Sequence, residues 1–168
     1  MKIMWIYTIL FFRKKIKSGT SEAKVRALGV FSDMVRAPSD DNINEECSKE
    51  LFEVLYGPET MVFITDQAKK PFGDISGGAF DVLMAASFHS WSLQMMLNVG
   101  GFFEYLLDRS TAKDKDTKDR KYALISAICS QKEVQNLIPG ELLKQLRNYV
   151  QQGAFYKEAT VEVAVDEQ

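Results

Sequence analysis

Apolar residues are densest between residues 79 and 109, and this stretch predicts two helices of different burial. The first, Ala79–Phe88, contains one ionisable residue, Asp81, so it must lie between other elements on nearly every side. A break at Gly100 and Gly101 precedes a second helix. Its apolar residues are spaced i, i+4, i+7 and i+8 and share one stripe: Val99, Phe103, Leu106 and Leu107. A buried helix beside a half-buried one is the cross-section of an α-solenoid.

The same pattern, a buried helix followed by a glycine break and a half-buried helix, recurs between Tyr122 and Val150. Leu124 follows Leu83 by 41 residues, and Gly140 follows Gly101 by 39 residues. Repeat periods of about 40 residues are typical of HEAT and armadillo proteins. The pattern therefore predicts an all-α fold, an armadillo/HEAT-like α-solenoid (α-α superhelix) that is short or truncated.

Three regions flank or interrupt the predicted repeats. Residues 1–18 form an apolar and then basic segment, in which the run Ile3–Phe12 is about half as long as a membrane-spanning helix. A secretory signal is disfavoured because the basic residues follow the apolar run, which leaves a buried first helix or a misassigned start of the reading frame. The helical repeats occupy residues 19–156 with an acidic loop at 37–47. Residues 157–168 are expected to form an extended or disordered tail.

Local signals predict where the helices of the first half begin and end. The helix Thr20–Val35 is expected to take Ser21 as its N-cap. The helix Ser48–Tyr56 is stopped by a Gly-Pro pair, and Pro58 then begins the next helix, which covers roughly residues 59–67.

The second half contains three further signals. Gly77 and Gly78 are predicted to form a tight corner between two helices. The charged run Thr111–Lys121 is predicted to be a solvated connector that becomes helical from Asp116 onward. Gly153 is predicted to stop the last helix.

Charge and cysteine content narrow the possible functions. The 21 Lys and Arg residues nearly balance 23 Asp and Glu residues, giving a net charge of −2, and no basic stripe interleaved with aromatic residues occurs. We therefore expect no nucleic-acid partner, and the short apolar run predicts no membrane partner. Cys47 and Cys129 lie far apart in sequence without CxxC spacing, as expected of thiols in a reducing compartment.

The residue pattern predicts neither catalysis nor metal binding. His89 is the one histidine and is distant in sequence from both cysteines, so a backbone carbonyl is a better partner for it than a metal. The phosphate-loop, nucleophile-elbow and dinucleotide-binding signatures are absent. Met84, Met95 and Met96 fit a helical core better than an adaptable binding groove. We expect no enzymatic activity, no cofactor and no metal.

The predicted partner contact uses the polar sides of the two helices that follow the glycine turns. In the first helix the apolar stripe centres on Phe103, and in the second it contains Leu142, Leu146 and Tyr149. Rotation of about 100° per residue then directs eight side chains outward. They are Glu104, Tyr105, Asp108, Arg109, Lys144, Arg147, Asn148 and Gln151. A solvated surface without a partner is the alternative interpretation.

Three phrases resemble the 26S proteasome non-ATPase regulatory subunit 5 family: GGFFEYLLDRS (100–110), DTKDRKYALISAI (116–128) and LRNYVQQGAFY (146–156). The resemblance implies a solenoid that chaperones assembly of the base of the 19S regulatory particle. Such proteins hold an AAA ATPase subunit by its C-terminal domain, without turnover, in the cytoplasm and also the nucleus. Family members are considerably longer, so a truncated gene model or a short isoform is expected, and residues 1–18 match nothing in the family.

A second hypothesis is a generic armadillo scaffold that binds an extended peptide of an unrelated partner. Such a scaffold typically presents asparagine and tryptophan at equivalent positions of successive repeats. Asn98 and Asn148, and Trp5 and Trp91, are not at equivalent positions, which disfavours this hypothesis.

Overall fold

The computed structural model describes residues 11–36, 45–71 and 73–157, and within these ranges every regular element is a helix. After a helical segment at residues 11–18, the helices fall into three groups of three along the chain. The first group is α2 (Ser21–Val35), α3 (Glu45–Glu53) and α4 (Thr60–Ala68); the second is α5 (Gly73–Ala86), α6 (Ser90–Leu97) and α7 (Phe102–Leu107); the third is α8 (Lys115–Cys129), α9 (Val134–Leu137) and α10 (Gly140–Gln152). The 3-10 turns η1 (Gly57–Glu59) and η2 (Arg109–Thr111) are short connections.

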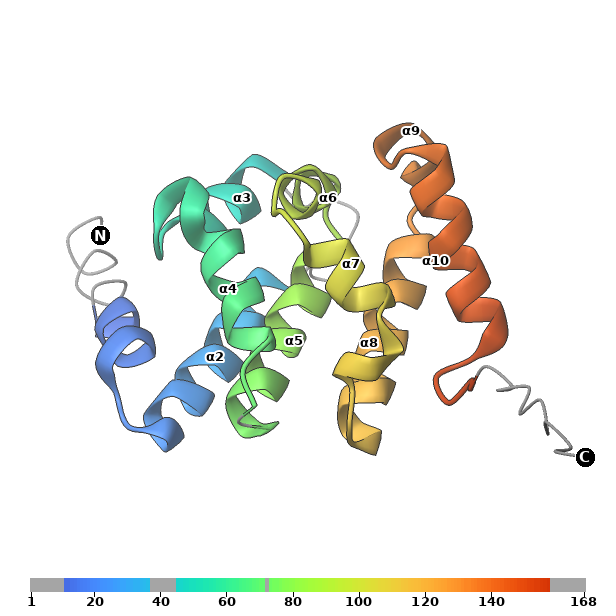
Figure 1. Cartoon of the computed structure of the whole chain (residues 1–168). Coiled ribbons are helices and arrows are strands. Elements are labelled where there is room, and N and C mark those ends of the chain that lie inside the picture. The colour runs from blue at the N-terminus through green and yellow to red at the C-terminus, as the bar shows by residue number, and fades with distance from the viewer. Residues whose placement is uncertain (1–10, 37–44, 72, 158–168) are drawn as a thin grey trace, which may run out of the picture.

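The first helix of each group packs on the first helix of the next. α2 packs against α5, and α5 against α8, so these helices follow one another across the molecule (Figure 1). α4 and α10 then pack against α5 and α8. Because neighbouring groups supply most of the contacts, the arrangement is compatible with the predicted α-solenoid, and the all-α prediction is confirmed for the described residues.

α5 is the central helix, and the glycine pair within it explains how two neighbours approach closely. A Cβ at Gly78 would lie 3.1 Å from the Leu28 Cβ of α2, and a Cβ at Gly77 would lie 3.1 Å from the Arg120 guanidinium of α8. Both glycines are buried inside α5. The predicted corner is therefore wrong, because these glycines serve helix packing on both sides rather than a turn.

The beginnings of α2 and α8 each differ from prediction by one residue. Thr20, rather than Ser21, caps α2 by accepting a 3.3 Å hydrogen bond from the Ala23 N–H. α8 begins at Lys115, because the Asp114 carboxylate caps it by accepting a 2.8 Å hydrogen bond from the Thr117 N–H. The predicted connector Thr111–Lys121 is thus mostly helical.

The acidic segment is only partly covered by the structure. Residues 37–44 lie outside the described residues, and Glu45–Cys47, which were predicted to belong to the loop, form the first turn of α3. The predicted helix Ser48–Tyr56 therefore begins and ends three residues early. Predictions for residues 1–10 and 158–168 also lie outside the described residues, while residues 11–18 are helical.

Two glycine turns adopt backbone conformations that favour glycine. Gly101 has φ 71° immediately before α7, which confirms the predicted break between the α6 and α7 helices. Gly153 has φ 86°, and its N–H donates to the carbonyls of Tyr149 and Val150 at 3.2 and 3.1 Å. The predicted stop of the last helix is therefore confirmed.

The core runs through all three groups. Leu83 and Leu124 are fully buried, as the repeat pattern predicts. On α7 the buried side chains include Phe102, which the predicted stripe omitted, and on α10 Leu143 is buried whereas Leu142 is half-buried. The two stripes are therefore correct in direction but rotated by part of a turn.

Candidate partner-binding surface

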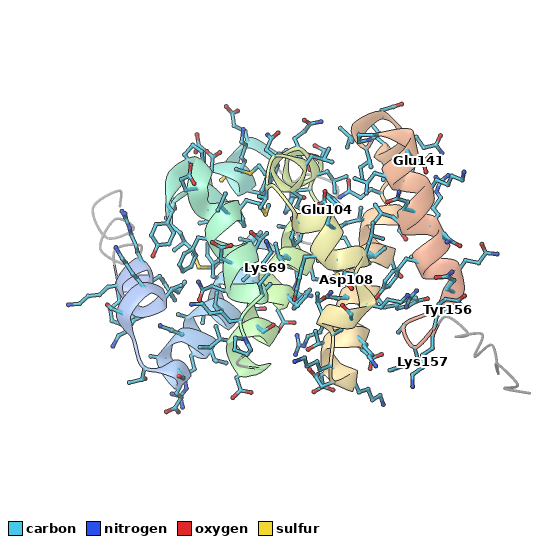
Figure 2. All side chains as sticks on the ribbon, in the orientation of Figure 1. Lys69, Glu104, Asp108, Glu141, Tyr156 and Lys157 are labelled. Carbon is cyan, nitrogen blue, oxygen red and sulfur yellow. The ribbon has the colours of Figure 1, made fainter. Side chains whose placement is uncertain are left out.

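α7 and α10 present adjacent polar faces to the surface. Glu104 and Asp108 on the α7 side, and Lys144 and Arg147 on α10, are exposed, as are Asn148 and Gln151. Figure 2 shows Glu104 and Asp108 between Lys69 at the end of α4 and Glu141 on α10. The structure thus brings six of the eight predicted side chains to the surface.

Tyr105 is engaged within the fold, contrary to the predicted outward orientation. Its hydroxyl donates a 3.1 Å hydrogen bond to the Ala68 carbonyl at the end of α4. The ammonium groups of Lys121 and Lys69 lie 4.0 and 5.8 Å from its ring centroid. Burial raises the pKa of its hydroxyl. Tyr105 therefore holds α7 to α4 instead of presenting a free contact.

Arg109 is also half-buried and bonded within the fold. Its guanidinium donates to the carbonyls of Gly153, Ala154 and Tyr149 at 2.8, 3.4 and 3.2 Å, and to Gln152 Oε1 at 3.2 Å. It also lies over the Tyr149 ring, 3.7 Å from the centroid. A cation at a helix C-terminus satisfies carbonyls that lack partners inside the helix. Arg109 thus fastens the end of α7 to the end of α10, and the predicted outward orientation is wrong.

Lys121 is fully buried, although it belongs to a run that was predicted to be solvated. Its ammonium donates to the carbonyls of Tyr105 and Asp108 and to the Thr111 hydroxyl, so all three donors have acceptors. Burial lowers its pKa to about 8, against a smaller opposing effect of the Asp108 charge. Lys121 belongs to α8, and its ammonium binds the carbonyls at the C-terminal end of α7.

The sequence contained a signal for this buried lysine. Lys121 precedes Leu124, Ile125 and Ile128 at helical spacing, so it lies on the apolar face of α8. No comparable local signal exists for Arg109, because its main partner Tyr149 lies forty residues further along the chain.

Asp108 combines exposure with a local structural role. Its carboxylate accepts hydrogen bonds from the Ser110 N–H at 2.9 Å and the Ser110 hydroxyl at 2.6 Å, which begin η2. These hydrogen bonds lower the pKa of the carboxyl, so it stays charged at neutral pH. Asp108 therefore keeps a negative charge in the groove that Gln145 and Asn148 of α10 also line.

A shallow groove follows the exposed face of α10. It is lined by Gln135, Glu141, Lys144, Arg147, Asn148 and Gln151. The opposite side of the helix buries Leu143, Leu146 and Tyr149. The groove also reaches the edge of Leu143, but most of its lining is polar. α10 therefore ends the row of packed helices with a mainly polar face that water or a partner can cover.

The histidine that could have served a metal site has a structural partner instead. His89 is buried, and its Nε2 donates to the Val35 carbonyl at 2.8 Å, which confirms the predicted backbone partner. Within the described ranges, no three His, Cys, Asp or Glu residues are placed to hold a metal ion. Cys47 and Cys129 form no disulfide. In that same part of the chain, none of the helices combines the length and apolar character needed to cross a membrane.

Comparison with known proteins places the chain among proteasome subunits. The 26S proteasome non-ATPase regulatory subunit 5 of Bos taurus is 26% identical over 150 residues, covering 89% of this chain and 30% of the relative. The Homo sapiens subunit 5 is 26% identical with the same coverage, and that of Drosophila melanogaster is 25% identical over 92% of this chain and 29% of the relative. No solved structure matches.

The chain spans about 30% of the length of these relatives. The family model described as proteasome non-ATPase 26S subunit matches residues 8–168, which is nearly the whole chain. The expectation that residues 1–18 match nothing in the family is therefore wrong for residues 8–18. The chain therefore belongs to the proteasome non-ATPase 26S subunit family.

Proposed function

We propose that this chain is a non-catalytic, protein-binding helical segment that assists assembly of the 19S regulatory-particle base. In this proposal it holds an AAA ATPase subunit of the base through that subunit's C-terminal domain, in the cytoplasm or nucleus. The family match over residues 8–168 carries the proposal, because relatives of the chain bear the name of a proteasome regulatory subunit.

The surface chemistry supports binding by the faces of α7 and α10. Acidic Glu104 and Asp108 lie on one helix and basic Lys144 and Arg147 on the next, and all four are exposed. Exposed charges of opposite sign on the two helices favour a partner that carries both signs over a partner of uniform charge. With Tyr105 and Arg109 used inside the fold, the proposed contact is reduced to Glu104, Asp108, Lys144, Arg147, Asn148 and Gln151.

The scaffold hypothesis receives no similar support. Trp91 donates from Nε1 to the Ser48 hydroxyl at 2.9 Å, and its ring packs on those of His89 and Phe52. A tryptophan with these interior contacts does not form part of a peptide-binding ladder. The absence of an asparagine at an equivalent position of α7 weighs in the same direction.

The proposal is tested by reversing the basic strip with Lys144→Glu and Arg147→Glu in one variant. Both side chains are exposed, so the melting temperature should change little. Capture of a purified base ATPase subunit by the full chain should weaken by about tenfold at physiological salt, since two interface charges then oppose the partner.

A matched variant, Lys14→Glu with Lys17→Glu, makes the same change in net charge at the opposite end of the described structure. It should capture the ATPase subunit as well as the unmodified chain. If both variants capture the ATPase subunit as well as the unmodified chain does, a contact on α10 is contradicted. If both variants are weakened equally, the loss comes from the change in net charge and not from a contact on α10.

A further inference from the structure

A second groove lies where the end of α7 meets the end of α10, and we call it the terminal groove. It has a volume of about 700 Å³, and its lining includes Asp108, Lys118, Phe155, Tyr156 and Lys157. Figure 2 shows Tyr156 and Lys157 beyond the end of α10, across from Asp108 at the end of α7. The charged residues of the proposed ATPase contact on α10, Lys144 and Arg147, are not among its lining.

Two adjacent aromatic residues are exposed in the terminal groove. Phe155 is 54% exposed and Tyr156 is 41% exposed, whereas most aromatic side chains of the described core are covered. Large aromatic residues that remain accessible in a groove are typical anchors of protein contacts. One wall of the groove is therefore suited to an apolar side chain of a partner.

The charge of the groove is positive. Lys118, Lys157 and Arg109 lie along it against a single carboxylate, that of Asp108. The guanidinium of Arg109 already donates to backbone carbonyls of the fold. The ammonium groups of Lys118 and Lys157 are therefore the positive groups available to a ligand. Neither lysine forms an ion pair with any other residue in the described part of the chain.

The α10 wall adds three amide side chains in a row. Gln145, Asn148 and Gln152 are exposed and spaced i, i+3 and i+7, so they follow one edge of the helix. Asn148 and Gln152 are four helical residues apart, a rise of about 6 Å, which is close to the ~6.6 Å repeat of groups on one side of an extended chain; Gln145 and Asn148 are about 4.5 Å apart along the helix. Gln152 Oε1 accepts a hydrogen bond from Arg109, which leaves the amide N–H groups of Gln152 as donors. Amides both donate and accept hydrogen bonds, as peptide groups do. These side chains can therefore pair with the backbone of an extended peptide.

We propose that the terminal groove binds an extended acidic segment of a partner protein. One apolar or aromatic side chain of that segment packs on Phe155 and Tyr156, its carboxylates approach Lys118 and Lys157, and its backbone pairs with the α10 amides. The terminal groove shares Asp108 and Asn148 with the proposed ATPase contact, but its lysines are different. Charge reversal at Lys118 and Lys157 therefore tests this binding without changing Lys144 and Arg147.

The test uses the full chain and a short fluorescein-labelled peptide in which glutamates flank one central phenylalanine. Fluorescence anisotropy should detect binding that weakens as salt rises, because Lys157 is exposed and Lys118 is half-buried, so salt can screen both charges. Lys118→Glu with Lys157→Glu should weaken binding by about tenfold, and Phe155→Ala by about fivefold. A peptide with alanine in place of phenylalanine should lose about as much as the Phe155→Ala variant does.

The controls are Phe88→Ala, which removes an aromatic ring that is 56% exposed elsewhere, and Lys14→Glu with Lys17→Glu. Both should bind the peptide normally. A lysine-flanked peptide that binds equally well would overturn the proposal, as would equal loss in the controls. If the peptide does not bind, and Lys118→Glu with Lys157→Glu instead breaks up a dimer in sedimentation, the groove is a contact between copies and the proposal is wrong.

Discussion

Two positively charged side chains, Lys121 and Arg109, bind the carbonyls at the C-terminal ends of two helices. These contacts connect α8 to α7 and α7 to α10. Lys121 reaches from α8 to the end of α7, and Arg109 reaches from the end of α7 to the end of α10. Carbonyls at helix C-termini carry partial negative charge, so positive groups stabilise them. Both residues therefore act as internal fasteners between helices, although their types alone indicate surface positions.

Lys121 should make the stability of the protein depend on pH in the alkaline range. Burial lowers its pKa from the ordinary value of 10.5 to about 8. Between these values the unfolded chain keeps the proton while the native state has released it, so the unfolded state binds more protons and the free energy of unfolding rises with pH. Below about pH 8 both states hold the proton and the contribution is constant.

The measurement compares urea unfolding of the unmodified chain with that of Lys121→Met from pH 7 to 9.5. The difference in unfolding free energy should be flat near pH 7 and then increase in favour of the unmodified chain, by at most about 1.4 kcal/mol per pH unit. Cys129 and the buried tyrosines have raised pKa values and act in the opposite direction, but they occur in both proteins and cancel. A difference that stays constant with pH would contradict the lowered pKa.

At this scale the sequence located partners within one helix and did not locate those in other helices. Gly153 was assigned correctly because its N–H bonds to carbonyls of the helix that it ends. For His89 the type of partner, a backbone carbonyl, was predicted correctly, but the acceptor Val35 lies on α2, 54 residues away, and the sequence did not identify it. Tyr105 and Arg109 were assigned to the surface because helical periodicity describes only one helix. Their partners belong to α4 and α10, and no spacing within α7 reveals them.

At the scale of elements, α5 is held between α2 and α8 by its two glycines. Alanine usually stabilises a helix interior by ~1 kcal/mol relative to glycine. At Gly77 the new methyl would meet the guanidinium of Arg120, which is the end of a flexible side chain, so Gly77→Ala should be neutral or slightly stabilising. At Gly78 it would meet the Leu28 Cβ, which cannot move without its helix, so Gly78→Ala should destabilise by about 1 kcal/mol.

Thermal melting of the two variants side by side tests this packing. The unmodified chain is the reference, and the two changes share the same helix and the same added methyl group. A Gly78→Ala protein at least as stable as Gly77→Ala would contradict the close approach of α2 and α5.

The register of the repeats is tested by Leu83→Asp and Leu124→Asp. Both leucines are fully buried at the centres of α5 and α8, so each carboxylate would be buried without a partner and should prevent stable folding. The exposed neighbour Ala123 provides the control, since Ala123→Asp should lower stability by less than about 1 kcal/mol. Circular dichroism melts distinguish these outcomes, and a cooperative melt of either leucine variant near the original temperature would contradict the register.

Element types were easier to predict than element limits. The offset between Leu83 and Leu124 located two buried helices correctly, because a repeat imposes the same burial twice. The predicted helix limits were wrong where a single side chain sets the boundary. The Asp114 cap begins α8 one residue earlier than the charge pattern indicated. Gly77 and Gly78 lie inside α5, where a corner between two helices was predicted. A glycine pair marks either a turn or a close approach of helices, and only the neighbouring helices show which applies.

At the scale of the whole molecule, three groups of helices pack in a row, with α7 near the middle and α10 at one end (Figure 1). Polar side chains of both helices are exposed. The chain belongs to a proteasome subunit family and spans about 30% of the length of its relatives. The exposed charged side chains of α7 and α10 favour a protein partner. These observations support the proposal that the chain assists proteasome assembly by binding another protein.

Affinity purification of the tagged full chain from cells, followed by quantitative mass spectrometry, tests this account most directly. If the chain holds a base ATPase during assembly, ATPase-ring subunits should be enriched over the 20S core, and Lys144→Glu with Arg147→Glu should reduce that enrichment. Lys14→Glu with Lys17→Glu should leave it unchanged. Recovery of no base ATPase subunit, or of ATPase and 20S subunits in the proportions of the complete proteasome, would contradict the proposed holding function.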